Sequence, residues 1–538
     1  MWQQNYTPIA NSLALSALVA AVPIFVLLFL IGIRRKPAWM ASLAGLGATV
    51  VLAVAVYRMP LGLLFSSVLY GAAFGLFPIG WVVFSAILLY RVTLESGKFN
   101  ILKDSIGQLT DDGRLQMMLI AFAFGAFIEG CAGFGTPVAV AATMLTGLGF
   151  SPFLAAAVCL LANTAPVAFG SIATPITTLA VTTGLPLERL SAGVGRICAP
   201  VSLFIPAYMI AVMCGWSGLR GVLPAAAVCG IAFAGTQFVV SNFIGPLLTD
   251  ILASMAAIGA LIVLFRVWKP RDKFDFGHLP PSKVSHGKGN VALAWAPYML
   301  LVVLVLLWGY RPIQAQLNSV NVVVNWPGLH NLVQRMPPVV AQPSGYAAVF
   351  NFNWLSAPGT ACLFAAILGA AVVGLKPAQF VAAFKHTAKQ LALAELTLAA
   401  VLALAFVMNY SGATVTLGLA FAATGVLFPL FSAVLGSLGV FLTGSDTSAN
   451  ALFGTLQQVT ATKLGMNPVL MASGNSAGGV MGKMISLTSI AVAAAATSMK
   501  REDEGRLFGF TLKHSIFLTL MIGLVVMFYA YVAPQLAP

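Results

Sequence analysis

Charged residues are scarce in this chain. Only 8% of its 538 residues are Asp, Glu, Lys or Arg, while 59% are hydrophobic and the mean hydropathy is +0.95. A soluble domain carries about 25% charged residues, so this chain cannot coat a globule of its size with charge. The composition therefore predicts a polytopic membrane protein and excludes a soluble globular one.

Acidic residues are fewer than basic ones, 14 against 28, and the net charge is +14. The basic residues lie mostly in short loops between apolar runs, where the positive-inside bias of membrane proteins accounts for them. Because no RNA- or DNA-binding motif accompanies them, we expect no nucleic-acid partner. The five histidines lie in loops or at segment ends, which disfavours a histidine relay within the membrane.

Motifs of cofactor and hydrolase chemistry are missing. The six cysteines show no CxxC spacing, and the sequence contains no Walker A motif, no HExxH and no GxSxG with triad partners. The glycine-rich tracts lack the strand–turn–helix setting of a dinucleotide site. We therefore expect no metal, no cofactor and no enzymatic activity. Because no motif for ATP chemistry is present, any transport by this chain must draw on an ion gradient or be passive.

Long apolar runs are what the sequence has instead, and they predict about 12 to 14 transmembrane helices. The run 13–33 is long enough to span a bilayer and is followed by three basic residues, which predicts an external N-terminus. Basic loops at 269–290, 376–389 and 500–506 should be cytoplasmic. The loop 311–353 and the C-terminus should be external.

Two stretches of the chain resemble each other. Gly130–Pro137, Gly149–Pro152 and Asn163–Pro166 in the first half correspond to Gly444–Asn450, Gly465–Pro468 and Asn475–Gly479 in the second. The landmarks recur at a nearly constant offset, which indicates a duplication. We expect a first half at 1–268, a cytoplasmic loop at 269–291 and a second half at 292–538. Whether the halves are parallel or inverted is open at this level.

Both stretches interrupt apolar runs with Gly, Pro and polar residues. They predict a re-entrant hairpin at about 116–149 and a broken helix at 152–180, repeated at about 432–460 and 468–498. Irregular backbone at membrane depth is tolerated where it lines a cavity, and half-helix N-termini attract anions. The alternatives are a glycine-rich helix-packing face and ordinary proline kinks.

Ionisable residues within membrane segments are functional candidates. The acidic ones are Glu129, Glu395 and Asp446, whereas Asp250 lies nearer a segment end and is expected at the interface. The basic ones are Arg196 and Lys483. A carboxyl group buried away from water holds its proton more tightly than an exposed one, so Glu129 or Asp446 is the predicted proton carrier. The alternative is that these groups form structural ion pairs.

At these residues the chain closely resembles the bacterial lactate permease family. The resemblance covers essentially the whole chain, and its motifs are Trp2–Tyr6, Gly125–Pro137, Asn163–Gly170, Ser241–Pro246, Arg335–Val340, Asn409–Gly412, Gly439–Ser448 and Gly482–Ser486. It implies a proton-coupled importer of L-lactate, and of D-lactate and glycolate, in a bacterial inner membrane. It also implies the inverted repeats, hairpins and elevator-like motion of the wider ion transporter superfamily. The superfamily signature is degenerate at Asn163-Thr164 and Asn475-Ser476, which disfavours a sodium site.

We therefore expect an all-α polytopic membrane protein that transports a small 2-hydroxy monocarboxylate with a proton. The predicted substrate-binding residues are Gly133, Gly135, Asn163, Thr164, Ser445, Thr447, Asn475, Ser476, Arg196 and Lys483. The predicted proton-coupling residues are Glu129 and Asp446. The alternatives are a sodium-coupled carrier of another small carboxylate, a membrane-embedded lipid-modifying enzyme and a channel. The sequence leaves the oligomeric state open, a homodimer included.

Overall fold

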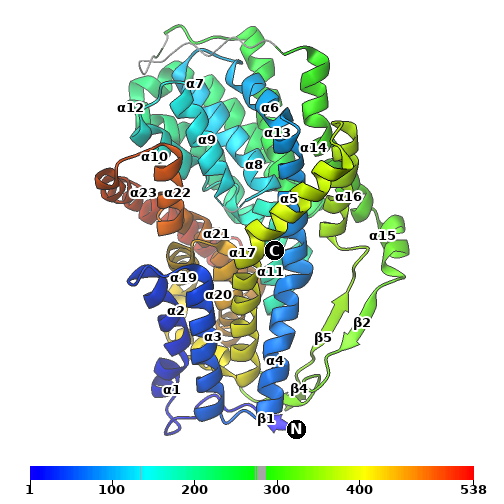
Figure 1. Ribbon diagram of the computed structural model, residues 1–538. Helices are drawn as coiled ribbons and strands as arrows, with labels where there is room; N and C mark the ends of the chain where they lie inside the picture. Colours follow the sequence, from blue (N-terminus) through cyan, green and yellow to red (C-terminus); the bar gives the residue numbers. More distant parts are fainter. Residues whose placement is uncertain (134, 273, 275–285) are drawn as a thin grey trace.

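The computed structural model describes residues 1–538 except 134, 273 and 275–285, and helices make up most of it (Figure 1). The all-α architecture expected of a polytopic membrane protein is confirmed. Much of the predicted loop 269–291 lies outside the described residues, as does Phe134 in the first hairpin.

The helices follow one another along the chain, and the strands lie between α15 and α16 except for β1 at the start. The first half forms α1 (Leu13–Ala20), α2 (Val22–Gly32), α3 (Ala38–Ala55), α4 (Leu61–Phe74), α5 (Trp81–Glu95), α6 (Lys98–Gly107), α7 (Gly113–Met117), α8 (Gly125–Cys131), α9 (Thr136–Gly147), α10 (Pro152–Ala162), α11 (Gly170–Thr183), α12 (Leu187–Phe243) and α13 (Thr249–Val267). The second half forms α14 (Lys288–Gly309), α15 (Arg311–Asn318), α16 (Pro358–Val372), α17 (Pro377–Ser411), α18 (Ala413–Phe421), α19 (Phe428–Thr443), α20 (Asp446–Lys463), α21 (Pro468–Lys483), α22 (Leu487–Ala496) and α23 (Arg501–Met527).

Short non-α segments join several of these helices. Three are π-helical, namely η1 (Gly75–Gly80), η2 (Met118–Phe124) and η5 (Phe528–Val532). Three are 3-10 helical, namely η3 (Val167–Phe169), η4 (Ala422–Leu427) and η6 (Pro534–Leu536). Segment η2 connects α7 to α8, so the first arm of the first hairpin is a nearly continuous helix over 113–131.

Within the described ranges, 11 helical stretches are long and apolar enough to cross a membrane, or 12 if the bent pair 152–162 and 167–183 is one span. The chain is thus a multi-pass membrane protein. Helix α12 counts once, yet its 57 residues would extend about 85 Å if they formed one straight helix, at 1.5 Å per residue, against a hydrocarbon thickness of about 30 Å. Non-helical backbone angles at Gly215 and Val222 interrupt it. Helix α12 is therefore long enough for two crossings.

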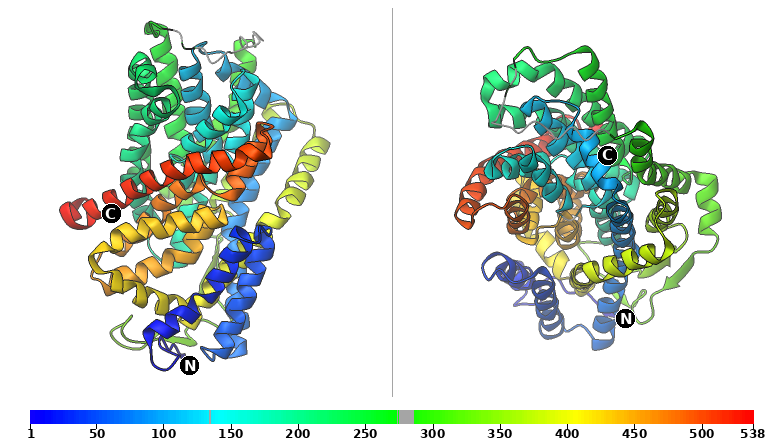
Figure 2. Two further views of the ribbon diagram at one scale, coloured as in Figure 1. Left: turned by 90° about the vertical axis from the view of Figure 1, so that its left-hand side faces the viewer. Right: turned by 45° about the horizontal axis from the view of Figure 1, so that its top comes forward.

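The few strands lie with α1 and the start of α4 at one end of the molecule, while α12 to α14 extend toward the other (Figures 1 and 2). Strand β1 (Trp2–Gln3) pairs in parallel with β3 (Val333–Arg335), which pairs with β4 (Ser344–Gly345). Strand β2 (Val322–Asn325) pairs with β5 (Val349–Phe352). The N-terminus and the 311–353 loop therefore lie on the same side.

Glycines let helices of the second half approach closely. A Cβ on Gly436 of α19 would lie 1.8 Å from the carbonyl oxygen of Asn475 on α21, and one on Gly478 would lie 2.1 Å from that of Ala433. Small residues at helix interfaces serve this purpose in membrane proteins. The first arm of the second hairpin therefore packs backbone to backbone against α21.

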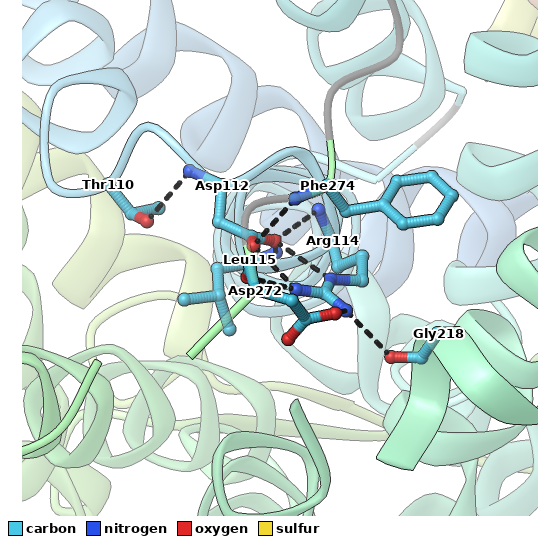
Figure 3. Close-up of polar contacts among 7 residues, drawn as sticks. All are labelled: Thr110, Asp112, Arg114, Leu115, Gly218, Asp272 and Phe274. Carbon is cyan, nitrogen blue, oxygen red and sulfur yellow. Dashed lines mark hydrogen bonds and ion pairs between the residues drawn. The ribbon is translucent and has the colours of Figure 1, made fainter. Parts of the chain in front are cut away.

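A buried arginine ties the start of the first hairpin to two other segments (Figure 3). The guanidinium of Arg114 is fully buried and contacts the Asp112 carboxylate at 2.7 Å and the Asp272 carboxylate at 2.9 Å. It also donates to the Gly218 carbonyl at 3.2 Å, within the interrupted part of α12. We call Arg114, Asp112 and Asp272 the arginine clasp. It joins α7, α12 and the chain that follows α13.

Candidate functional site

The first hairpin turns between α8, which ends at Cys131, and α9, which begins at Thr136. Gly133 and Gly135 have φ angles of +60° and +80°, which L side chains rarely adopt. Helix α9 packs back against α8 and η2. A Cβ on Gly133 would lie 2.9 Å from the Ser171 Cβ, so this glycine also lets the hairpin tip contact the broken helix.

The first broken helix bends by 67° between α10 and the segment that follows. After η3, Ser171, Ile172 and Ala173 all adopt left-handed backbone angles, with φ of 46°, 55° and 55°. Left-handed geometry costs roughly 1–2 kcal/mol per non-glycine residue, so surrounding packing must hold this turn. Such strain is typical of a functional site, and Ser171 is buried with no partner for its hydroxyl among the described residues.

The second hairpin turns at Gly444 and Ser445, between α19 and α20. Gly444 has a φ of +74°. The Ser445 hydroxyl accepts a hydrogen bond from the Ser448 amide and so caps α20, whose first residue is Asp446. The N-terminus of α20 therefore begins at the hairpin tip.

The second broken helix differs from the expectation. The predicted break at Asn475 to Gly479 is wrong, because α21 runs without interruption from Pro468 to Lys483. The chain breaks instead at 484–486, where the Ser486 hydroxyl accepts from the Ser489 amide and caps α22. The side chain of Asn475 is fully buried, donating to Asn450 and accepting from Gln457.

The two tips and the two breaks surround one cavity of about 240 Å³. At about 30 Å³ per water molecule, this volume holds a three-carbon acid with a few waters. Its polar lining comes from both halves and comprises Glu129, Gly133, Gly135, Ser171, Thr174, Thr443, Gly444, Ser445, Asp446, Thr447, Ser448, Lys483, Thr488 and Ser489. Apolar residues of α2, α3 and α17 complete the wall.

Three helices point their N-termini at this cavity: α9 at Gly135, α20 at Ser445 and α22 at Thr488. The first turn of a helix has amides without intrahelical partners and carries a partial positive charge. Such N-termini bind anions without further help from charged side chains.

Lys483 supplies a cation at the same place. It is 9% exposed, and its Nζ donates to the Gly444 carbonyl at 2.8 Å. No carboxylate of the described residues lies within ion-pair distance of it, although its charge acts on both Glu129 and Asp446. Lys483 therefore holds the second tip and keeps positive charge available to a ligand.

The two candidate proton carriers have different surroundings. Asp446 is the first residue of α20, and its Oδ2 accepts from the Ser476 hydroxyl at 2.7 Å and from the Asn450 amide at 3.4 Å. Glu129 lies in the last turn of α8, faces Asn163, and has a buried Oε2 without a hydrogen-bond partner among the described residues. A helix N-terminus favours a carboxylate and a C-terminus opposes one, so the two positions favour opposite charge states.

The structure brings some predicted site residues together and leaves others apart. Gly133, Gly135, Ser445, Thr447 and Lys483 line the cavity with Glu129 and Asp446. Of the remaining predicted ligands, Ser476 and Asn475 lie behind Asp446, and the Thr164 hydroxyl donates to the Leu161 carbonyl of its own helix.

Two charged residues lie elsewhere than expected. Arg196 is not in the cavity wall, because its guanidinium donates to Asn242 and to the Leu536 carbonyl. Asp250, expected at the interface, is 1% exposed and packs against the first hairpin. The position of these residues along their apolar runs therefore did not predict the surroundings of either side chain.

Several hydroxyl groups of the cavity wall escaped the sequence analysis. Ser171 and Thr174 follow the first break, and Thr443, Thr488 and Ser489 flank the second tip and second break. A local signal existed for the first pair, since Gly170 and Pro175 enclose them within an apolar run. Hydroxyls are common in membrane helices, so residue type alone does not single them out.

Comparison with known proteins decides the family. The profile of the L-lactate permease family matches residues 16–533. The chain belongs to the L-lactate permease family. It is 42% identical over 551 residues to the L-lactate permease of Escherichia coli K12 and 42% identical over 564 residues to that of Bacillus subtilis 168, with 100% of each chain covered.

One similar protein is named for a substrate other than lactate. The chain is 42% identical over 553 residues to the glycolate permease GlcA of Escherichia coli K12, covering 99% of this chain and 98% of that protein. Among solved structures, the YdaH transporter of Alcanivorax borkumensis aligns with 88% of this chain and 90% of its own, at 15% identity and a TM-score of 0.49. As a member of the L-lactate permease family, the chain is a transporter and not an enzyme.

Proposed function

We propose that this permease imports L-lactate, and also D-lactate and glycolate, across a bacterial inner membrane together with a proton. One observation carries the proposal: three helix N-termini and Lys483 converge with two carboxyl groups on a single small cavity. The names of the relatives, L-lactate permease and glycolate permease, support the substrate class. Both substrates are small 2-hydroxy acids.

In this proposal, the substrate carboxylate lies between Lys483 and the first-turn amides of α20 and α22. These donors form charge-assisted hydrogen bonds, which are stronger than neutral ones. The backbone at Gly133 and Gly135 and the side chains of Ser445 and Thr447 complete the contacts. Arg196, Asn475 and Ser476 take no part as direct ligands, since none of them lines the cavity.

The substrate hydroxyl is assigned to the hydroxyl groups of Ser171 and Thr174. Ser171 has no protein partner among the described residues, so a ligand hydroxyl would satisfy a buried polar group that otherwise stays unpaired. A substrate without the 2-hydroxyl would leave that group unsatisfied. The proposal therefore favours lactate and glycolate over acetate.

The coupled proton binds to Glu129 or Asp446. An anion in the cavity raises the local negative charge and favours protonation of a nearby carboxyl group, which links one uptake event to the other. We further propose that the two halves are inverted repeats, that both hairpins are re-entrant, and that both termini are external. The cavity would then open alternately to the two sides.

Purified protein in proteoliposomes tests the function. With an inward proton gradient and no sodium, labelled L-lactate should accumulate and the external medium should become alkaline. Unlabelled D-lactate and glycolate should compete, and acetate should compete weakly. Accumulation that appears only with an inward sodium gradient would replace this proposal by sodium coupling.

A further inference from the structure

Asp250 is a buried carboxyl group that the proposed mechanism does not use. It lies in the first turn of α13 and is 1% exposed. A Cβ on Gly130 would lie 2.9 Å from the Asp250 Cβ, so the side chain packs directly against the tip of the first hairpin. Asp250 interacts electrostatically with Glu129, the residue before Gly130, and it lies outside the cavity wall.

Neither oxygen of Asp250 has a hydrogen-bond partner among the described residues, and both are buried. The titratable groups that face it are Glu129 and Cys131 on α8 and Cys198 on α12. None of these is a cation. An unpaired buried charge is costly, and a second one of the same sign beside it is more so. Glu129 and Asp250 therefore retain at least one proton between them in this conformation.

Asp446 is arranged differently. Its burial opposes a charge, and its Oδ1 has no partner among the described residues. The N-terminus of α20, the Ser476 hydroxyl and the charge of Lys483 act in the other direction and favour its carboxylate form. Of Glu129 and Asp446, Glu129 is the less favourable position for a negative charge, because it lies at the C-terminal end of α8 and its Oε2 has no partner among the described residues. The carboxylate form is therefore better supported at Asp446 than at Glu129 or Asp250.

We propose that Glu129 and Asp250 form the proton-binding pair of this permease, with Asp250 as the member remote from the substrate. The inference rests on the proposed proton coupling. The step moves one proton from the carboxylic O–H of one member to a carboxylate oxygen of the other, and no other bond changes. A substrate anion near Lys483 draws the proton onto Glu129, and its departure lets the proton return to Asp250.

The test separates net transport from exchange. Asp250→Asn removes the titratable group with little change in shape. It should abolish proton-driven accumulation of L-lactate, while exchange of internal for external lactate, which needs no net proton movement, persists. Asp111→Asn makes the same chemical change at an exposed loop residue and should retain both activities.

Wild-type protein is measured first. Failure of wild type to accumulate lactate with protons would refute the proposed coupling itself. Accumulation by wild type and also by Asp250→Asn, with equal proton uptake, would overturn only the pair. Loss of exchange along with accumulation in folded Asp250→Asn would give Asp250 a structural role and would also overturn it.

Infrared difference spectroscopy keeps the inference testable if Asp250→Asn does not fold. At neutral pH, the wild-type spectrum should contain the C=O stretch of a protonated, poorly hydrated carboxylic acid. That band should change in Glu129→Gln and not in Asp446→Asn. A band that is absent, or that responds to Asp446→Asn alone, would contradict the pair.

Discussion

Replacement of Lys483 by glutamine is the sharpest test of the cavity as an anion site. Lys483 is 9% exposed and its Nζ donates to the Gly444 carbonyl, to which a glutamine amide N–H can also donate. The substitution therefore removes charge while keeping a donor for the hairpin tip. The loss is one charge-assisted hydrogen bond to the substrate, about 1.5–3 kcal/mol, or about 10- to 150-fold in affinity.

Binding of labelled L-lactate to purified protein measures this effect directly. Lys483→Arg keeps the charge and should retain more affinity than Lys483→Gln, although the larger guanidinium must fit a site with little free space. Lys500→Gln is the matched control, because Lys500 is exposed and does not line the cavity. A dissociation constant for Lys483→Gln within about twofold of wild type would refute the assignment.

Three further predictions concern stability, each measured by thermal unfolding in detergent. Asp112→Asn should lower the free energy of unfolding by about 3–5 kcal/mol, because it leaves the fully buried Arg114 short of a counter-charge. Asp272→Asn should lower it by under about 1 kcal/mol, because the Asp272 side chain is 58% exposed. Equal losses in the two variants would contradict the arginine clasp. Arg114 lowers the pKa of Asp272 below its ordinary 3.8. The stability that this carboxylate contributes is therefore fully present above pH 3.8 and is lost as the pH falls through the lowered pKa. The difference in unfolding temperature between wild type and Asp272→Asn should vanish in acid. Gly436→Ala should destabilise by about 1–3 kcal/mol because its Cβ would overlap the Asn475 carbonyl, and unchanged stability would contradict the close packing of α19 on α21.

The positions of the hairpins follow from residues with strong local preferences. Gly133, Gly135 and Pro137 cannot continue a smooth helix, and Gly444 with Ser445 gives a helix end followed by a cap. These signals act within a few residues, so they survive in any tertiary context. That is why the sequence placed both turns.

The second break was misplaced because small residues have two uses in membrane helices. Gly478 and Gly479 look like a break, but they let α19 and Asp446 approach the helix. The better signal was Ser486, which caps the next helix. The left-handed turn at Ser171 has no local signal at all, since non-glycine residues adopt such angles only where packing imposes them.

Each of the two hairpin tips has a carboxyl group beside it, and the two carboxyl groups lie at opposite ends of their helices. Asp446 begins α20, so the helix dipole stabilises its negative charge, while Glu129 ends α8, so the dipole opposes it. Because each tip is a helix–turn–helix, moving a carboxyl group from one side of the turn to the other reverses this effect. A carboxyl group before the turn and one after it therefore differ in how well the same kind of backbone supports a negative charge. In the proposed mechanism, Lys483, whose charge acts on both carboxyl groups, would let a bound substrate anion influence the proton carrier without an ion pair at either site.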